Sequence, residues 1–528
     1  MDLLKIFQDC WGWCRGNNAN QTLPSSPETT DEINNGGAEP ESSLEVVTFE
    51  ETGEEEETKL DLEVINQIKD FDIEDLNPQQ ESLIDKLIPD KKLKKQFKEY
   101  GLCPECQQVN SGKDWCRSCN SRRFQESFKN WTSGNSEVDK FIQKSQLEAV
   151  DANKVLEWIP YEKFKNIKFL AKGGYSTVYK ADWNDKTVAL KVLDNSQDII
   201  KDDKDKFFQE IVRHKLFNND YVVKCYGISH EPKTGNYVMV MEYIEGGNLR
   251  QYLLKNSQLS FVSRLNQLKN LALGLSSIHE EGLIRKDFHP GNVLNTFRSE
   301  YCTDSYVTDL GLSRPINEAN DGKIYGVLPY VAPEVLIQKT YNQASDIYSF
   351  GIIAYEIFSN LPPYHEYARD KALVLRIREG LRPEFKIKIP SSLENLVKKC
   401  WDANPLKRPA ASEIYAALRS WCREIRDKKD TEFVRQYQEA EEANKMLEPN
   451  EQRHSFYSSF YETYPQEFFT SRLLEFRGAE GAEFYQDVPV IVVEEATSED
   501  NNISAVLTET IEEMSNEELI SRVQVPPK

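Results

Sequence analysis

The stretch from residue 161 to residue 424 changes once from strand-like to helix-like sequence, and this order restricts the possible folds. Its first part holds short β-branched and aromatic runs between turn residues, such as TVYKADW, TVALKVLD and YVMVMEY, which predict strands. Beyond GGNLRQYL, apolar residues recur at helical intervals, at Phe261, Leu265, Leu268, Leu271, Leu275 and Ile278. Strands first and helices second predict an α+β fold, with a sheet lobe beside a helical lobe and a cleft between them.

Several short motifs follow one another within this stretch. LAKGGYSTVYKA (170–181) is a glycine-containing hairpin whose amides can approach phosphate oxygens, although alone it is better explained as an ordinary turn. The helical pattern DKFFQEIVRHKLF lies between the strands. The further motifs are VALKV with Lys191, FFQEI with Glu210, IRKDFHPGNVL with Asp287 and Asn292, DLG at 309–311 and APE at 332–334. Each charge taken singly suits a solvated surface position, but their order points to one shared site.

With these motifs in this order, residues 161–424 resemble a eukaryotic protein kinase domain and look most like its tyrosine-kinase-like group. The resemblance implies a bilobal fold, ATP and Mg²⁺ as cofactors, and protein substrates. Lys191, held by Glu210, would neutralise phosphate charge, and Asp287 would accept the proton of the substrate hydroxyl. Asn292 and Asp309 would hold Mg²⁺. The residues implied around ATP are Leu170, Ala171, Gly173, Gly174, Val178, Ala189, Lys191, Met241, Glu242 and Ile244.

The resemblance also implies supporting residues. Asp346 in SDIYSFG would brace the catalytic loop, and Glu334 would form a buried ion pair with Arg408. Serine or threonine is the expected acceptor, while tyrosine and dual specificity stay open. They stay open because Val327 and His289 fit neither the usual serine/threonine pattern nor the usual tyrosine pattern.

Four positions depart from the pattern of the family. Ala171 and Ser176 replace two of the usual loop glycines, and Ser176 would weaken ATP binding if its backbone is forced into an unfavourable region. Arg285 and Lys286 replace the usual His-Arg before Asp287. Arginine is long and charged, which suits a dry position poorly. All groups that would touch phosphate, metal or proton are present, so an active kinase is favoured over a pseudokinase that serves as a nucleotide-binding or protein-binding scaffold.

CPECQQVNSGKDWCRSC contains two CxxC pairs, Cys103/Cys106 and Cys116/Cys119. Each pair can place two thiolates on one turn, and two such turns complete a tetrahedron for Zn²⁺. The segment resembles a small knuckle finger with an asparagine, Asn110, after its second cysteine, but it is one residue short of that pattern. Buried or redox thiols are the alternative. Relatives of the finger bind RNA or ubiquitin, so a nucleic-acid-binding adaptor was also considered.

Composition restricts partners and location. The chain has 528 residues and a net charge of −22, so it lacks the basic footprint of generic nucleic-acid or membrane binding. No stretch reaches the ~20 apolar residues of a membrane span, and IYSFGIIAYEIF fits a buried helix. Without a secretory signal, and with ten cysteines expected to stay reduced, the protein is predicted to be intracellular, in the cytoplasm. Its oligomeric state is left open.

These observations predict six regions. Residues 1–60 are expected to be disordered and acidic, because they cannot bury enough apolar surface to offset ordering entropy. The acidic character suits either solubility or a basic partner. The other predicted regions are a helical segment (61–100), a zinc-knuckle-like segment (101–120), a helical connector (121–160), the kinase domain (161–424) and an acidic C-terminal tail that is mostly disordered beyond one helix (425–528).

Overall fold

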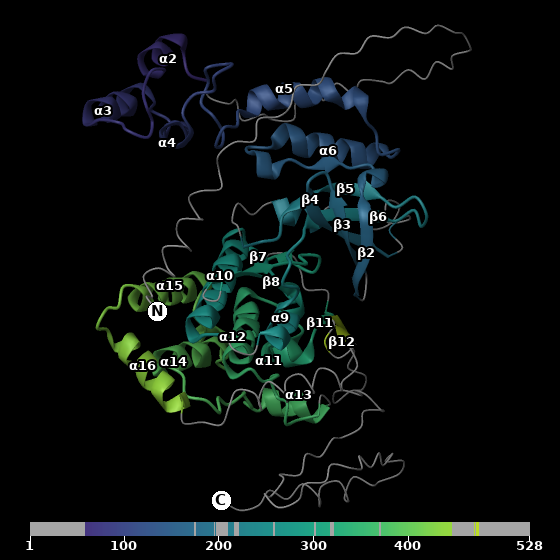
Figure 1. The fold of residues 1–528 in the computed structure, drawn as a ribbon, viewed down its shortest axis with the longest axis vertical. Coiled ribbons are helices and arrows are strands. Elements are labelled where there is room, and N and C mark those ends of the chain that lie inside the picture. Colours follow the sequence, from purple (N-terminus) through teal and green to yellow (C-terminus); the bar gives the residue numbers. More distant parts are fainter. Residues whose placement is uncertain are drawn as a thin grey trace, which may run out of the picture.

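A computed structural model of the chain describes residues 59–173, 176–194, 196, 210–215, 221–256, 259–299, 302–316, 322–368, 371–445, 469 and 471–474. Figure 1 shows a small group of helices, a sheet lobe and a helical lobe that follow one another along the molecule. The disorder predicted for residues 1–58 and for most of the chain beyond 445 concerns segments outside the described residues.

The N-terminal helices form a small cluster of their own. They are α2 (Leu62–Ile68), α3 (Pro78–Leu87) and α4 (Lys91–Tyr100). The side chain of Asn77 caps α3, and that of Asp90 caps α4. Their shared core consists of Leu60, Ile65, Ile68, Ile84, Ile88 and Phe97. Leu60 is therefore buried, which places it with the helices and not with the predicted disordered region.

The region 121–160, predicted as a helical connector, contains most of α5 (Arg117–Ser127), all of α6 (Ser136–Glu148) and a short strand near its end. Residues Glu157–Trp158 form β1, which pairs in parallel with the strand Cys225–His230 (β5) of the sheet lobe. Val138 and Ile142 of α6 lie in one hydrophobic cluster with the sheet residues Ile228 and Met239. The connector is thus packed onto the sheet lobe and extends its core.

The sheet lobe has the strand order β1-β5-β6-β4-β3-β2. Its strands are β2 (Lys165–Lys172), β3 (Ser176–Trp183), β4 (Lys186–Leu193), β5 (Cys225–His230) and β6 (Tyr237–Glu242). Consecutive strands from β2 to β4 are antiparallel, and β6 lies between β4 and β5. Residues 210–215 are helical, as the pattern DKFFQEIVRHKLF predicts. Central β6 is buried almost throughout, whereas edge strand β2 is exposed.

The second lobe is mainly helical. Its helices are α9 (Leu249–Lys255), α10 (Phe261–Glu280), α11 (Pro333–Gln338), α12 (Gln343–Ser359), α13 (Lys371–Arg378), α14 (Ser391–Cys400), α15 (Ala411–Arg426) and α16 (Glu432–Lys445). Its short strands are β7 (Leu283–Ile284), β8 (Val293–Ser299), β9 (Cys302–Val307), β10 (Arg314–Pro315), β11 (Ile324–Gly326) and β12 (Arg472–Leu474). One large hydrophobic cluster joins these elements.

Helix α12 lies in the centre of the hydrophobic core of this lobe. The apolar α12 is buried from Ser345 to Ser359, as expected for a core helix. No helix among the described residues combines the length and apolar character needed to cross a membrane.

The predicted helix beyond residue 430 is α16, and Phe433 stacks on Trp421 of α15 at 4.4 Å between ring centroids. The helical lobe therefore continues past residue 424.

An ion pair ties the start of α11 to the far side of the lobe. Both guanidinium Nη atoms of Arg408 donate to the carboxylate of Glu334, at 2.6 and 2.8 Å. Arg408 also donates to the carbonyls of Ala344 and Asp402. The pair predicted from the sequence is therefore formed, and its bidentate geometry with additional acceptors satisfies the buried charge.

Candidate active site

Lys191 joins the sheet lobe to two acidic groups. It lies on β4, opposite Val178 of β3 and Met239 of β6. Its Nζ donates to Glu210 Oε1 at 2.7 Å and to Asp309 Oδ1 at 2.9 Å. The structure thus brings together a cation from a strand, a carboxylate from a helix and a carboxylate from the helical lobe.

The charges of this triad stabilise one another. Burial by itself lowers the pKa of Lys191, but Asp309 and Glu210 outweigh it and the net pKa is raised. For Asp309, burial raises the pKa, yet Lys191 and Arg285 lower it well below its usual range. The Asp309 side chain is 45% exposed, whereas that of Glu210 is 9% exposed. Asp309 is therefore an ionised carboxylate that solvent and ligands can reach.

Backbone contacts hold the segment Asp309–Gly311 against the helix that carries Glu210. A Cβ on Gly311 would lie 2.9 Å from Glu210 Oε2, closer than real Cβ contacts, so only glycine fits without a shift. Arg213, one helical turn after Glu210, donates to the carbonyls of Leu310 and Gly311 at 3.4 Å each. Arg213 was missed by the sequence analysis, because nothing in its local pattern shows which carbonyls it reaches.

Asp287 lies in the loop after β7 and is 4% exposed. Asn292 Nδ2 donates to its Oδ2 at 2.9 Å and to its backbone carbonyl at 3.1 Å. His289 Nε2 lies 3.4 Å from Asp287 Oδ1, while His289 Nδ1 accepts a hydrogen bond from the Gly291 amide. Because Nδ1 is the acceptor, the ring proton belongs on Nε2, facing the carboxylate.

Two cationic or donor groups keep Asp287 ionised. Burial raises the pKa of a carboxyl group, but His289 and Arg285 outweigh that effect and the pKa of Asp287 is lowered. A buried carboxylate with directed hydrogen bonds has a fixed orientation. Asp287 can therefore accept a proton from a hydroxyl group presented to it.

The carboxylate of Asp346 holds the backbone of the loop that carries Asp287. Its Oδ2 accepts from the Arg285 amide at 2.7 Å and faces His279 Nε2 at 2.9 Å, and its Oδ1 accepts from the Lys286 amide at 2.9 Å. Lys286 has a φ of 64°, in the left-handed region that non-glycine residues rarely adopt. Asp346 thus holds the strained residue before Asp287, as the sequence analysis expected.

Arg285 is accommodated in the dry position that the sequence analysis treated as unsuitable. Its side chain is fully buried, and Nη2 donates to the carbonyl of Thr308 at 2.7 Å, directly before Asp309. Its Nε and Nη1 are buried without a hydrogen-bond partner. The arginine therefore links the loop that carries Asp287 to the segment that begins at Asp309, and its charge lowers the pKa of both carboxylates.

His214, which lies on the same helix as Glu210, is neutral. Burial lowers its pKa to about 4, and Lys191 and Arg285 act in the same direction. Its Nδ1 lies 2.9 Å from the Val223 carbonyl, so Nδ1 carries the proton. A neutral imidazole avoids adding a second charge beside Arg285.

Replacing Arg285 by methionine is expected to move the acid limb of the activity–pH profile to higher pH. Asp287 and Asp309 act as carboxylates, so activity falls as the pH drops through their pKa values. The Arg285 charge lowers both values, and its removal lets them rise. Loss of the donor to Thr308 should also lower the free energy of unfolding by about 1–3 kcal/mol.

The measurement is kcat/KM against pH for the wild type, Arg285→Met and Arg285→Lys. The lysine variant keeps the charge, so its acid limb should stay near that of the wild type even if its turnover falls. An acid limb that is unchanged in the methionine variant would contradict the electrostatic role of Arg285.

Most of the residues predicted around ATP lie on strands β3 and β4 and at the C-terminal end of β6. Val178 and Ala189 lie on β3 and β4, Met241 pairs with Ala189, and Met241 and Ile244 are buried. The Glu242 amide donates to the Lys224 carbonyl at 2.9 Å. The Ile244 amide has no partner within the described part of the chain, so it is free to bond a ligand.

The hairpin between β2 and β3 is closed by a bond from the Gly173 amide to the Ser176 carbonyl at 2.7 Å. Leu170 lies exposed on β2, and Ala171 pairs with Val178. Neither Ala171 nor Ser176 has a positive φ, so neither replacement strains the backbone. Gly174 lies outside the described residues.

Gly326 is a further site residue that the sequence analysis missed. Its φ is 126°, and a Cβ there would lie 3.4 Å from Asp287 Oδ1. The only local signal was a glycine shortly before APE, which is common in turns. Its position shows that the activation segment (309–334) approaches the catalytic aspartate at this point.

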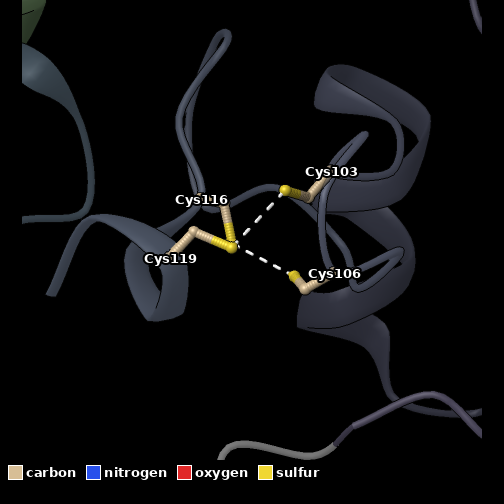
Figure 2. A group of neighbouring side chains, drawn as sticks. All are labelled: Cys103, Cys106, Cys116 and Cys119. Atoms are coloured by element: carbon tan, nitrogen blue, oxygen red, sulfur yellow. Dashed lines mark hydrogen bonds between the residues drawn. The ribbon is translucent and has the colours of Figure 1, made fainter. Parts of the chain in front are cut away.

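The four cysteines meet as the spacing predicts. Figure 2 shows their side chains pointing toward a common centre, with Cys103 and Cys106 on one turn and Cys116 and Cys119 on the other. All four sulfur atoms lie within 4.8 Å of one another, with 3.9 Å between Cys103 and Cys119 and 3.5 Å between Cys106 and Cys116. Zn–S bonds of about 2.3 Å in a tetrahedron separate sulfurs by about 3.8 Å. The donor set and spacing therefore fit a zinc ion.

The thiols are also protected from solvent. Burial raises the pKa of Cys116 to about 11 and raises that of Cys119 further. For Cys103, burial raises the pKa, but backbone donors from Cys106 and Glu105 outweigh it. The sulfurs are too far apart for disulfides, which need about 2.05 Å. Burial thus disfavours free thiolates at Cys116 and Cys119, and a bound metal ion would supply the positive charge that stabilises them.

A sheet lobe with a lysine between two carboxylates, set against a helical lobe that carries a buried aspartate, defines a protein kinase domain. Comparison with known proteins gives the same class, because residues 164–418 match the family model described as protein tyrosine and serine/threonine kinase. This segment belongs to that family, so the kinase fold predicted from the sequence is confirmed.

Relatives of the chain carry kinase names. The chain is 30% identical over 286 residues to RGS domain-containing serine/threonine-protein kinase A of Dictyostelium discoideum, covering 54% of this chain and 25% of that protein. It is 30% identical over 254 residues to dual specificity protein kinase zakA of the same organism, covering 45% of this chain and 32% of that protein. Serine/threonine-protein kinase VIK of Arabidopsis thaliana is 30% identical over 270 residues, covering 48% and 59%. The chain thus spans less than two thirds of each relative.

Proposed function

We propose that this chain is an ATP- and Mg²⁺-dependent protein kinase that transfers the γ-phosphoryl group of ATP to serine or threonine hydroxyls. One observation carries the proposal. Lys191 is bonded to both Glu210 and Asp309 at 2.7 and 2.9 Å, while Asp287 is a buried carboxylate of lowered pKa. Phosphoryl transfer needs positioned charge more than covalent chemistry, and this arrangement supplies it.

In this proposal Lys191 binds the α- and β-phosphates, and Glu210 fixes its direction. Amides of the β2–β3 hairpin around Gly173 approach the phosphates, Val178 and Ala189 cover the adenine ring, and the backbone of Glu242 and Ile244 bonds its edge. The free Ile244 amide supports this role.

Asp309 and Asn292 are the proposed Mg²⁺ ligands. Asp309 offers an ionised and partly exposed carboxylate. Asn292 uses Nδ2 on Asp287, which leaves its Oδ1 as an oxygen ligand of the kind Mg²⁺ prefers. When bound, the metal neutralises phosphate charge.

Asp287 then orients the acceptor hydroxyl and takes its proton as the oxygen bonds to phosphorus. Asn292 and His289 hold the carboxylate in place, at 2.9 and 3.4 Å. The ester bond forms as the bond from the γ-phosphorus to ADP breaks, so ADP leaves and the proton passes to Asp287.

The relatives' names support serine/threonine preference, and the name of zakA keeps dual specificity open. The pseudokinase alternative is not favoured. It rested on Arg285, which is hydrogen-bonded to Thr308, and on Ser176, which is unstrained.

We also propose that the four-cysteine cluster binds a structural zinc ion. Buried thiols held within 4.8 Å support this assignment. An ATP-dependent enzyme with reduced cysteines suits a reducing, intracellular compartment.

Replacing Lys191 by methionine is expected to lower phosphorylation of protein substrates about 100-fold or more, because the phosphates lose their buried cation. The purified full chain would be incubated with labelled ATP, Mg²⁺ and a peptide array, followed by phosphoamino-acid analysis. Lys186→Met is the matched control, since Lys186 starts the same strand β4 but is exposed. Equal incorporation by the wild type and Lys191→Met would refute the proposed function.

A further inference from the structure

A segment near the C-terminus lies on the activation segment. Residues Arg472–Leu474 form β12, which pairs antiparallel with β11 in the register Ile324↔Leu474, Tyr325↔Leu473 and Gly326↔Arg472. Figure 1 shows β11 and β12 side by side at one flank of the helical lobe. Segments about 150 residues apart in the sequence thus share a ladder, which demands a reason beyond local propensity.

The ladder ends at the catalytic aspartate. Gly326, the last residue of β11, lies so close to Asp287 that a Cβ on it would be 3.4 Å from Oδ1. Arg472 is opposite Gly326. The chain of β12 therefore reaches the strand edge nearest to the proposed base.

The other edge of β11 is already taken. The Tyr341 hydroxyl accepts from the Tyr325 amide and donates to the Tyr325 carbonyl, both at 2.8 Å. Backbone groups alternate in direction along a strand, so those of Ile324 and Gly326 point toward β12. An extended chain can add to β11 only on the side that β12 occupies.

Phe469 fixes the segment beside the loop that carries Asp287. Its side chain is 3% exposed, its carbonyl accepts from Arg250 Nη1 at 3.5 Å, and the Arg250 guanidinium lies 4.6 Å from its ring centroid. A Cβ on Gly291, in the catalytic loop, would lie 3.8 Å from the Phe469 carbonyl. The segment therefore contacts both the loop and the strand that flank the base.

Two buried apolar side chains anchor the segment. Phe469 and Leu474 both join the large hydrophobic cluster of the helical lobe, at 3% and 4% exposure. Between them lies a described hydroxyl residue, Ser471, next to the Arg472 that pairs with Gly326. The strand Arg472–Leu474, with a hydroxyl residue and two buried apolar side chains beside or within it, is thus already bound at this edge.

We propose that Phe469 and residues 471–474 occupy the protein-substrate site in cis and compete with protein substrates for the edge of β11. This inference rests on the proposed kinase function. A substrate whose hydroxyl reaches Asp287 must run between β11 and the catalytic loop, where the segment lies. Backbone hydrogen bonds to the edge of β11 would supply affinity for a substrate. The buried positions that Phe469 and Leu474 occupy favour substrates with apolar side chains on both sides of the acceptor hydroxyl.

The first test compares the full-length wild type with the double variant Phe469→Ala/Leu474→Ala. Release of the segment should lower the KM for an array-selected peptide about tenfold, as expected if about a tenth of the wild type is open. The KM for ATP should stay unchanged, because the contacts established for the segment are with Arg250, Gly291 and β11 of the helical lobe. Leu406→Ala/Ile337→Ala is the matched control, since Leu406 and Ile337 are exposed residues of the same lobe.

The second test adds the segment back as a peptide. A synthetic peptide of residues 466–477, with Thr470→Val and Ser471→Ala so that it cannot accept phosphate, should inhibit the double variant competitively against the peptide substrate. The same peptide with both anchors changed to alanine should not inhibit. An equal peptide KM in the wild type and double variant, or equal inhibition by both peptides, overturns the proposal.

Hydrogen exchange separates this inference from the proposed function because it needs no catalysis. The amides of Ile324 and Gly326 should exchange slowly in the wild type and faster in the double variant. If no variant phosphorylates any peptide, the kinase proposal fails, and with it competition with substrates. Protected amides would then still establish that the segment covers β11, whereas equal exchange in both proteins would show that it does not.

Discussion

Asp287→Asn should lower the turnover number for phosphoryl transfer by about 10³–10⁴-fold while leaving ATP binding intact. The amide has nearly the shape of the carboxylate, so the contacts with Asn292 and the surrounding loop can persist. It cannot accept the hydroxyl proton, and it removes the negative charge that orients the acceptor. The effect therefore belongs to the chemical step.

The measurement pairs single-turnover phosphorylation with an ATP-dependent thermal shift. Wild type and variant should show the same stabilisation by ATP·Mg²⁺, because at one fixed ATP·Mg²⁺ concentration the stabilisation depends on the dissociation constant, which the substitution leaves unchanged. Asp182→Asn is the matched control, since Asp182 is a half-buried carboxylate of the sheet lobe that accepts a hydrogen bond from Asn166 Nδ2 at 2.7 Å. Retention of more than about a tenth of the activity would exclude Asp287 as the base.

Removing zinc should unfold the cysteine segment and loosen the sheet lobe. Structural zinc contributes about 10–16 kcal/mol of apparent folding free energy in small zinc-binding peptides, far more than so short a segment can replace. Without a cation, four thiols held within 4.8 Å lose the interaction that orders them.

The effect should travel through the C-terminal end of α6, to which the cysteine segment is hydrogen-bonded. Trp115 Nε1 donates to the Ala149 carbonyl at 3.0 Å, Ser111 Oγ to that of Val150 at 2.9 Å, and Arg117 Nε to that of Leu147 at 3.3 Å. Because Val138 and Ile142 of α6 belong to the core of the sheet lobe, its thermal stability should fall with the metal.

Metal analysis should find one zinc ion per chain, lost on chelation or in Cys116→Ser and kept in Cys422→Ser. Cys422 is a half-buried thiol of α15, outside the cluster. Chelation should shift tryptophan emission to longer wavelength, and Trp115→Phe should reduce that change. Unchanged emission and melting temperature after complete metal removal would contradict a structural role.

Arg285 departs from the usual histidine of the family, yet it still links the loop of Asp287 to the backbone just before Asp309. The sequence analysis saw a long charged side chain in a dry position. In the folded protein its guanidinium donates to Thr308 and lowers the pKa of two carboxylates that must be ionised. The outcome depends on the position of a carbonyl 23 residues away, which no local pattern encodes.

Much of the sheet lobe was predictable because its strands are long enough to show their character. TVALKVLD became β4, and the burial of α10 follows the spacing of its leucines. The two-residue β1 and three-residue β12 have no period to detect. Each exists because a partner strand offers an unpaired edge.

Residue identity and order were enough to reveal the resemblance of residues 161–424 to a protein kinase domain. A lysine, a glutamate, two aspartates and an asparagine in this sequence predict phosphoryl transfer, and paired cysteines predict a metal, because chemistry restricts which side chains serve. Only the tertiary structure decided which groups face one another. It seated Arg285 beside Thr308, joined the cysteine segment to α6 and set β12 on the edge beside Asp287. Such contacts depend on the spatial meeting of distant segments, and that is a property of packing rather than of any local stretch of sequence.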